Sequence, residues 1–325
     1  MNLLVTGGAG FIGATFVRRR RAHRPDDAIV VLDALTYAGT RDNLAGVADV
    51  SFVHGDVCDA GLVTRVLAEH RIDHVVHLAA ESHVDRSIVA PDAFVRTNVL
   101  GTAALLHAAR AAQVRRFVHV STDEVYGELA DGAAPWREDA PLAPRSPYAA
   151  SKAAADHLVS AFVATYGMAA LITRCTNNYG PRQMPEKLIP RCTLAALHNR
   201  PLPLYGDGRQ VRDWIHVDDH CDALERVLDG GLPGQIYHVA GDDDRDNLAV
   251  ARAILAATGR PEALLTHVPD RPGHDRRYAL DASKIARELG FTARRRFTAA
   301  LPETVAWYAD HAPWCEAALT RLGAA

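Results

Sequence analysis

Two short stretches of the sequence carry side chains suited to acid–base chemistry, and the first is a tyrosine–lysine pair. Tyr148 and Lys152 form Y-x-x-x-K at the start of a helical pattern, and this spacing places both on one helix face. A tyrosine is a useful base only if its pKa, ordinarily about 10, falls toward neutrality, which takes about 4 kcal/mol. One ammonium group about 4 Å away supplies roughly that energy at an effective dielectric constant of about 20. The pair therefore predicts a phenolate base tuned by a lysine, with an ordinary surface Tyr and Lys as the alternative.

The second reactive stretch follows the fifth predicted strand and contains Thr122, Asp123 and Glu124. In open α/β sheets, ligands bind outside the carboxyl ends of the strands. Two adjacent carboxyl groups at such a place can divide the roles of acid and base if their surroundings separate their pKa values. A solvated Asp-Glu turn is the alternative interpretation.

A glycine-rich stretch near the start of the chain predicts a dinucleotide site. Residues 3–13, LLVTGGAGFIG, give an apolar strand, a glycine cluster and the start of a helix, and Gly8, Gly10 and Gly13 fit G-x-G-x-x-G. Such glycines let the backbone approach a pyrophosphate at the helix N-terminus. Asp33 follows a second apolar strand, 20 residues after Gly13, where a carboxylate binds the adenosine ribose. A carboxylate there repels a 2′-phosphate, so the pattern favours NAD over NADP.

The elements that must position these residues alternate between short apolar runs and longer helical patterns up to about residue 175. This alternation predicts an α/β fold with a Rossmann-type, doubly wound parallel sheet. The predicted strands are Leu3–Thr6, Ile29–Leu32, Ser51–Val53, His74–Leu78, Arg116–Val120 and Ala170–Arg174. The predicted helices between them are Phe11–Arg21, Ala60–His70, Asp92–Ala112 and Tyr148–Tyr166.

The pattern changes after residue 176, because prolines become frequent between residues 181 and 203. We expect a smaller, mostly C-terminal α+β lobe that binds the substrate. The expected cofactor domain is 1–176, with 211–241 rejoining it through a helix at Asp218–Leu228 and a strand at Ile236–Val239. The expected second lobe is 177–210 and 242–325, with helices at Leu248–Ala257, Ser283–Leu289 and Ala299–His311.

The overall composition excludes several classes of protein. The chain has 325 residues, of which 48% are apolar and 23% charged, and its net charge is −3. These values are ordinary for a globular protein and provide no general positive field for nucleic acid or an anionic membrane. Nothing resembles a signal peptide or a membrane span, and the five cysteines are scattered without C-x-x-C spacing. We therefore expect a reduced, cytoplasmic protein.

One group of residues imitates a metal site. His216, Asp218, Asp219 and His220 are close together in the sequence, but they coincide with the start of a predicted helix. An aspartate at that position satisfies free backbone N–H groups. We interpret the group as a helix start and expect no metal.

Seven motifs along the chain belong together: TGGAGFIG, AAESHVDRS, STDEVYG, SPYAASKAAADHL, NNYGPRQMPEKLIP, LYGDGRQVRDWIHVDDH and RPGHDRRYALDASKI. In combination they resemble the extended short-chain dehydrogenase/reductases. Within that group the sequence most resembles the dTDP-glucose 4,6-dehydratases, from Leu3 to about Tyr308.

The resemblance implies a role for each reactive residue. Tyr148 would take the proton from the sugar 4-hydroxyl while the C4 hydride passes to NAD+. Lys152 would tune Tyr148 and hold the nicotinamide ribose, and Thr122 would hydrogen-bond near the 4-oxygen. Glu124 would remove the C5 proton and Asp123 would protonate the departing C6 hydroxyl. The hydride then returns to C6, which gives a 4-keto-6-deoxy sugar.

The resemblance also implies binding residues and a homodimer. The cofactor contacts would be Gly7, Gly10, Phe11, Ile12, Gly13, Asp33, Asp56, Val57, Ala79, Tyr148 and Lys152. A capping role is the alternative for Asp56. The nucleotide-sugar contacts would be Ser82, Asn177, Lys187, Leu188, Pro203, Tyr205, Arg212, Asn247, Arg271, His274 and Tyr278. Arg212 and Arg271 suit a diphosphate because a guanidinium donates to two oxygens at once. In this family the helices that match Asp92–Ala112 and Tyr148–Tyr166 form the dimer core.

Three features depart from the family pattern. Thr176 stands where a serine is expected, Met184 stands where a phenylalanine is expected, and residues 241–246 are unusually acidic before Asn247. The acidic run is expected near the nucleotide pocket, so it leaves the choice between thymine and uracil open.

Other enzymes of the same fold are the alternatives. Nucleotide-sugar 4-epimerases share Tyr148 and Lys152 but generally lack the acid pair. UDP-glucuronate decarboxylases and GDP-mannose dehydratases resemble the chain at Glu124 but typically carry Ser or Thr in place of Asp123. A non-catalytic dinucleotide-sensing protein would have lost Tyr148 or Lys152. Asp123 therefore favours a 4,6-dehydratase for a nucleoside-diphosphate glucose, with dTDP-glucose ahead of UDP-glucose.

Overall fold

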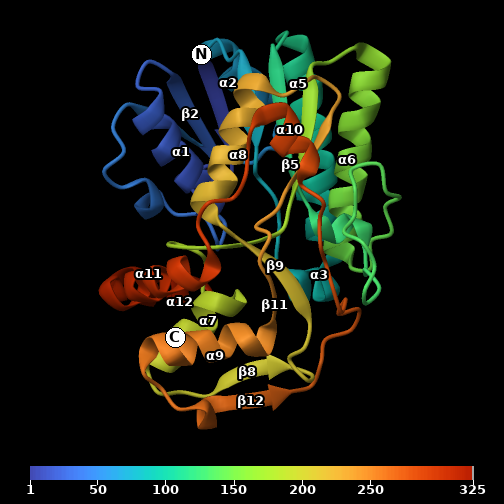
Figure 1. Cartoon of the computed structure of the whole chain (residues 1–325). Coiled ribbons are helices and arrows are strands. Elements are labelled where there is room, and N and C mark those ends of the chain that lie inside the picture. Colours follow the sequence, from blue (N-terminus) through green and yellow to red (C-terminus); the bar gives the residue numbers. More distant parts are fainter. Residues whose placement is uncertain (324–325) are drawn as a thin grey trace.

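The larger sheet confirms the predicted doubly wound fold. Within residues 1–323, which the computed structural model describes, it has seven strands, all parallel, in the order β10-β6-β5-β4-β1-β2-β3 (Figure 1). The strands are β1 (Asn2–Thr6), β2 (Ala28–Asp33), β3 (Val50–His54), β4 (His74–His77), β5 (Arg116–Thr122), β6 (Ala170–Cys175) and β10 (Ile236–Val239).

The strand order reverses next to β1, because β2 and β3 lie on one side of it and β4, β5 and β6 lie on the other. A crevice for ligands forms at such a switch point, outside the carboxyl ends of the strands. Asp33, Thr122 and Cys175 are the last residues of β2, β5 and β6. The topology therefore brings residues from distant parts of the sequence to one edge of the sheet.

Helices cover both faces of this sheet, and successive strand residues alternate between two cores. Leu3 and Val5 of β1 pack on one face with α1 (Phe11–His23), α8 (Val217–Gly230) and α10 (Ser283–Leu289). Leu4 packs on the other face with α2 (Ala60–Glu69), α5 (Thr102–Ala111) and α6 (Pro147–Tyr166). Burial on both faces explains why the strands are almost continuously apolar.

The segment predicted as one helix over Asp92–Ala112 contains a change of helical type. Short helices α3 (Val84–Val89) and α4 (Pro91–Phe94) precede a π-helical stretch, η2 (Val95–Gly101), which leads into α5. Asn98 lies in the π-helical stretch, and its side-chain amide donates to the Glu81 carbonyl and the Ser151 hydroxyl. The π-helical stretch is therefore hydrogen-bonded both to the loop after β4 and to α6.

The smaller lobe is mixed α and β, as expected, and it gathers below the larger sheet in Figure 1. One sheet contains β7 (Asn177–Tyr179), β9 (Val211–His216) and β11 (Asp244–Asp246), and another contains β8 (Leu202–Tyr205) and β12 (Leu265–Val268). The helices are α7 (Leu188–Leu197), α9 (Asn247–Thr258), α11 (Phe297–Asp310) and α12 (Ala312–Arg321). Across the two lobes, the chain also forms single 3-10 turns at η1 (Arg41–Leu44), η3 (Asp123–Tyr126) and η4 (Glu262–Leu264).

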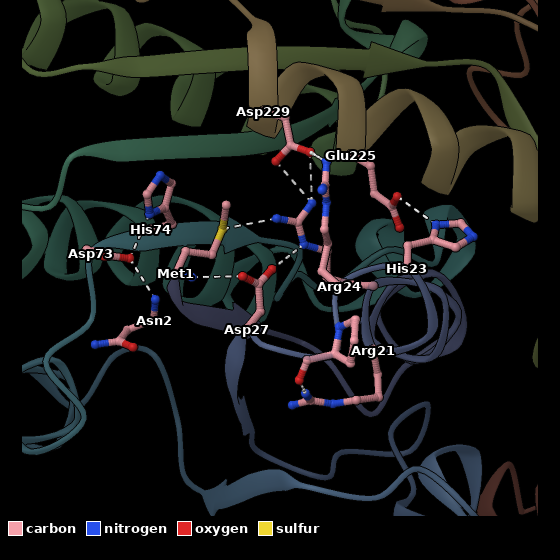
Figure 2. A network of polar contacts seen from close by, with 12 residues as sticks. Met1, Asn2, Arg21, His23, Arg24, Asp27, Asp73, His74, Glu225 and Asp229 are labelled. Atoms are coloured by element: carbon pink, nitrogen blue, oxygen red, sulfur yellow. Dashed lines mark hydrogen bonds and ion pairs between the residues drawn. The ribbon is translucent and has the colours of Figure 1, made fainter.

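Helix α8 returns the chain to the larger lobe and is held there by ion pairs with α1. Arg20 of α1 is buried and donates to Asp27 and to both carboxylate oxygens of Asp229 near the end of α8. Figure 2 shows Asp229 beside Arg24, and Glu225, one turn earlier, beside His23. A buried guanidinium is tolerated only when its charge is paired, so these carboxylates fix α8 on α1.

Helix α10 lies in a different lobe from the one expected, and strand β9 lies between the two lobes, with Ile215 in the core of the larger sheet and Trp214 in that of the smaller lobe. Ile285 of α10 packs in the core shared by α1, α8 and the larger sheet, and Lys284 donates to the Ile236 carbonyl of β10. Strand β9, expected to rejoin the larger domain, pairs instead with β7 and β11. An apolar stripe shows that a helix is buried but not which sheet it covers, which is why the sequence placed α10 wrongly. Among the described residues, no helix combines the length and apolar character needed to cross a bilayer.

Candidate active site

A cavity of about 330 Å³ lies where the carboxyl ends of the central strands meet the smaller lobe. The predicted cofactor residues all line it: Gly7, Gly10, Phe11, Ile12, Gly13, Asp33, Asp56, Val57, Ala79, Tyr148 and Lys152. It is also lined by the other predicted catalytic residues, Thr122, Asp123 and Glu124, and by the predicted substrate residues Ser82, Asn177 and Lys187. Residues with reactive side chains from between Gly7 and Lys187 therefore line one cavity.

The glycine turn leaves a cradle that no side chain can enter. A Cβ on Gly13 would lie 2.1 Å from the Gly7 carbonyl oxygen, and Gly7 itself has a φ of +68°. Asp33, beside this turn, accepts from the backbone N–H groups of Ala9 and Leu35 at 2.9 and 2.8 Å. An open backbone turn at the N-terminus of α1, with a buried carboxylate next to it, fits the pyrophosphate and ribose of NAD.

Asp56 lines the cavity and does not cap a helix. Its carboxylate accepts from the backbone N–H of Cys58, whereas the N-cap of α2 is Asp59, which accepts from Leu62. The capping alternative for Asp56 is therefore wrong.

Helix α6 begins at Pro147, and the Ser146 hydroxyl caps it by accepting from Ala149. This start places Tyr148 and Lys152 in the first two turns, where both side chains line the cavity. The Lys152 ammonium donates to the Val120 carbonyl at 2.7 Å and lies 3.4 Å from His119 Nε2. Burial lowers the pKa of Lys152 to about 8.

The pKa of Tyr148 is shifted in the direction opposite to the sequence prediction. Burial raises it well above 10, the charge of Glu124 raises it further, and Thr122 opposes the rise. Lys152 is directed to Val120 and His119 rather than to the phenol, so in this arrangement its ammonium does not offset the burial. The shared helix face is confirmed, and the direct tuning of the phenol is not.

The acid pair follows β5 in a 3-10 turn and is held by Thr122. The Thr122 hydroxyl donates to Asp123 Oδ1 at 3.1 Å and accepts from the Glu124 N–H. Burial and the neighbouring Glu124 raise the pKa of Asp123 to about 8. Burial also raises the pKa of Glu124, but the charges of Arg271, Arg212 and Lys187 oppose that rise. Asp123 therefore keeps its proton at neutral pH, while Glu124 is the carboxyl group that nearby cations favour as an anion.

Five side-chain oxygens in the cavity wall are buried with no hydrogen-bond partner among residues 1–323. They belong to Ser121, Asp123 (Oδ2), Thr176, Asn177 and Gln183. A buried oxygen without a partner costs about 1–3 kcal/mol. A polyhydroxylated ligand would satisfy these oxygens.

The remaining predicted substrate residues lie in or next to the smaller lobe, outside the cavity lining. Arg212 of β9 is buried, stacks on the Tyr278 ring at 4.2 Å and donates to the Asp275 carbonyl. Arg271 lies 3.5 Å from Asp85, which also accepts from the Tyr205 hydroxyl at 3.0 Å.

The other four predicted substrate residues are His274, Leu188, Pro203 and Asn247. The His274 ring is 6.1 Å from that of Tyr205, and its Nδ1 lies 2.6 Å from Asp270. Leu188, Pro203 and Asn247 occupy α7, β8 and the start of α9, and none of the three lines the cavity.

The acidic run at residues 241–246 does not line the cavity, and part of it makes contacts within the smaller lobe. Asp213 accepts from the backbone of Gly241 and Asp243, and Asp243 accepts from Phe297. Asp246 is the N-cap of α9. The side chains of Asp243 and Asp246 therefore have local folding roles in the smaller lobe.

The group that imitates a metal site has structural contacts. Helix α8 starts at Val217, and the ring of His216, rather than an aspartate, caps it by accepting from Asp218. Asp219 accepts from two backbone N–H groups of residues 294–295, and His220 contacts Asn178. Within residues 1–323 no set of three or more His, Cys, Asp or Glu side chains is arranged to hold a metal ion.

Three cavity residues with reactive side chains were not predicted from the sequence. Glu81, Cys175 and Glu186 all line the cavity. Glu186 accepts from the Tyr37 hydroxyl at 3.0 Å, and the Cys175 thiol lies near the Ser121 carbonyl. Glu81 and Glu186 belong to the motifs AAESHVDRS and NNYGPRQMPEKLIP, whose other members were selected, so the signal was available.

Comparison with known proteins identifies the family. The family model described as GDP-mannose 4,6 dehydratase matches residues 4–304. A dTDP-glucose 4,6-dehydratase of Streptomyces niveus is 51% identical over 97% of this chain and 95% of its own length. The chain belongs to the dTDP-glucose 4,6-dehydratase family. Another dTDP-glucose 4,6-dehydratase, from Streptomyces venezuelae, was solved with NAD and TYD bound. It superposes with a TM-score of 0.94 at 50% identity and covers 98% of this chain and 100% of its own.

Proposed function

We propose that the chain converts dTDP-glucose to dTDP-4-keto-6-deoxyglucose with bound NAD. The observation that carries this proposal is the adjacent pair Asp123 and Glu124: burial and Glu124 raise the pKa of Asp123 to about 8, whereas three nearby cations oppose the rise of the Glu124 pKa. Elimination of water from a hexose needs an acid at C6 and a base at C5, and the pair offers one of each. The 51% identity to an enzyme named dTDP-glucose 4,6-dehydratase supports the substrate.

Tyr148 would begin the reaction by taking the proton of the sugar 4-hydroxyl. The glycine cradle and Asp33 would hold NAD, which when bound would supply the hydride-transfer chemistry at C4 and C6. The raised pKa of Tyr148 makes the phenol a poor base unaided. We infer that the Lys152 ammonium turns from the Val120 carbonyl toward the phenol during this step, so that its charge stabilises the phenolate.

The elimination would follow from the 4-ketone, which acidifies the C5 proton. Glu124 would take that proton as a carboxylate, and Asp123 would give its proton to the C6 hydroxyl, which leaves as water. The pKa of Asp123, about 8, keeps the acid protonated at neutral pH. Each proton transfer is worth about 10²–10⁴ in rate.

Cations from the smaller lobe would hold the diphosphate. Lys187 lines the cavity, and Arg212 and Arg271 lie close enough to Glu124 to oppose the rise of its pKa. Guanidinium groups suit phosphate oxygens because they donate in a fixed fork. Leu188, Pro203, Tyr205, Asn247, His274 and Tyr278 stay proposed nucleotide contacts.

The test is to incubate the purified chain with NAD+ and no reductant, separately with dTDP-glucose and UDP-glucose. Loss of one water and a 4-keto-6-deoxy spectrum by mass spectrometry and NMR is expected, faster with dTDP-glucose. Faster turnover of UDP-glucose would change the assigned nucleobase from thymine to uracil. A product of unchanged mass with inverted C4 would identify a 4-epimerase and remove the roles given to Asp123 and Glu124.

We also propose a cytoplasmic homodimer. Exposed apolar side chains occur on α3, on η2 and at the end of α6: Val89 is 86% exposed, Leu100 59% and Tyr166 47%. Exposed apolar side chains on these elements support contact with a second copy of the chain. The five free cysteine thiols are consistent with a reducing compartment.

A further inference from the structure

Three polar side chains are buried next to Lys152 without lining the cavity: His119 on β5, Asp156 on α6 and Arg174 on β6. His119 Nε2 lies 3.4 Å from the Lys152 ammonium and 3.5 Å from Asp156 Oδ1. Arg174 Nε donates to Asp156 Oδ2 at 2.8 Å. The cluster therefore connects Lys152 to a carboxylate and a guanidinium that have no access to substrate or cofactor.

The position of Asp156 follows from the helix. Tyr148, Lys152 and Asp156 are spaced four residues apart, so they share one face of α6. Asp156 is 1% exposed. One of its carboxylate oxygens pairs with Arg174, and the other faces His119 and has no hydrogen-bond partner among the described residues. A buried carboxylate with one unpaired oxygen destabilises the folded state unless its negative charge also stabilises a second buried cation.

Lys152 is the buried cation that the negative charge of Asp156 can stabilise. A buried ammonium loses its proton unless an opposite charge opposes the burial, and the Val120 carbonyl is neutral. Burial lowers the pKa of Lys152 to about 8, and the charge of Asp156 opposes that decrease.

The other titratable groups that face Lys152 do not supply this negative charge. His77 on β4 and His119 are kept neutral by burial and by Lys152, with the pKa of His77 lowered to about 3 and that of His119 well below its usual range. Burial raises the pKa of the Cys175 thiol to about 12, which keeps it neutral too. Arg174 carries a positive charge, which Asp156 balances.

We propose that Asp156 is a positioning residue for the reaction: its buried negative charge keeps the Lys152 side chain protonated, and Arg174 and His119 hold the carboxylate in place. This inference rests on the proposed function in one respect: the proposed function assigns Lys152 to the oxidation at C4.

The test isolates that oxidation. A dTDP-6-deoxyglucose has no C6 hydroxyl to lose, so its reaction stops after hydride transfer and is followed by the absorbance of NADH in a single turnover. The rate is measured from about pH 6 to about pH 10, either side of the Lys152 pKa of about 8. The variants are Asp156→Asn, which removes the charge and keeps the shape, and Asp156→Glu, which keeps the charge. Tyr126→Phe is the matched control, because it removes only the hydroxyl that Arg174 contacts on its far side.

Asp156→Asn is expected to move the alkaline limb of the rate at least about one pH unit lower, so that the rate at pH 9 falls about tenfold. Asp156→Glu and Tyr126→Phe are expected to keep the wild-type limb. An unchanged limb in Asp156→Asn, or an equal shift in Tyr126→Phe, would overturn the proposal.

A second variant covers the case in which Asp156→Asn does not fold. Asp156→Leu combined with Arg174→Met removes both members of the ion pair and leaves no uncompensated charge. Its alkaline limb should also move lower, and a wild-type limb would refute the role of Asp156. Hydride transfer by the wild-type chain tests the proposed function, whereas the comparison among variants tests this inference, so the two can fail separately.

Discussion

Replacing Asp123 by asparagine removes a proton donor while keeping the shape of the side chain. Asp123 is 2% exposed, and its pKa of about 8 means that about ten side chains are protonated for each ionised one at pH 7. An amide cannot protonate the C6 hydroxyl. Loss of a general acid slows a step by about 10²–10⁴, which corresponds to about 3–5 kcal/mol of barrier. We expect Asp123→Asn to slow the dehydration by this factor.

The assay must show which step is slowed. Oxidation at C4 uses Tyr148 and not Asp123, so the variant should still form NADH from dTDP-glucose. NADH should then accumulate, because the elimination that precedes hydride return has lost its acid. Stopped-flow absorbance follows NADH, and mass spectrometry of quenched samples follows the loss of water. A variant that dehydrates at the wild-type rate, or that forms no NADH, would refute the assignment.

The same substitution has a predicted effect on stability. The folded pKa of Asp123, about 8, lies above the unfolded value of about 3.9, so the native state holds a proton that the unfolded state lacks between these two pH values. The contribution of Asp123 to wild-type stability is therefore fully present below about pH 4 and is lost as the pH rises toward 8. Asparagine has no such loss, so Asp123→Asn should gain stability relative to wild type between pH 5 and pH 9, by several kcal/mol at about 1.36 kcal/mol per unit. Urea unfolding of both proteins at pH 5 and at pH 9 measures this gain. If the free energies of unfolding of variant and wild type differed by the same amount at the two pH values, the proposal that Asp123 is buried as a protonated acid would be contradicted.

Three further substitutions test other parts of the site and the assembly. Tyr148→Phe should slow NADH formation at least about 10²-fold while the purified protein keeps its NAD, and a wild-type rate would exclude Tyr148 as the base. Gly13→Ala places a Cβ 2.1 Å from the Gly7 carbonyl oxygen, so the purified variant should contain little NAD; a normal content, measured after denaturation, would argue against the cradle. Val89→Glu puts a charge on a side chain that is 86% exposed, so light scattering should show a smaller mass, and an unchanged dimer would move the interface elsewhere.

The sequence by itself determined the parts of the site that depend on short-range geometry. The glycine turn, Asp33 and the start of α6 each arise within one strand–turn–helix unit, and their residues line the cavity as expected. Parallel strands must end at the same edge of a sheet, so the acid pair after β5 was also placed correctly. Periodicity and spacing were sufficient there because the relevant neighbours are close along the chain or fixed by strand direction.

Only the tertiary structure decided which distant groups surround these residues. It directs Lys152 to the Val120 carbonyl and His119, and it brings Arg212 and Arg271 near Glu124. It also places α10 on the larger sheet. The physical reason is that a pKa or an ion pair depends on burial and on charges within a few ångströms, and those neighbours can be far apart in the sequence, as Arg20 and Asp229 are. Helical and strand patterns record that a face is buried, but not what covers it.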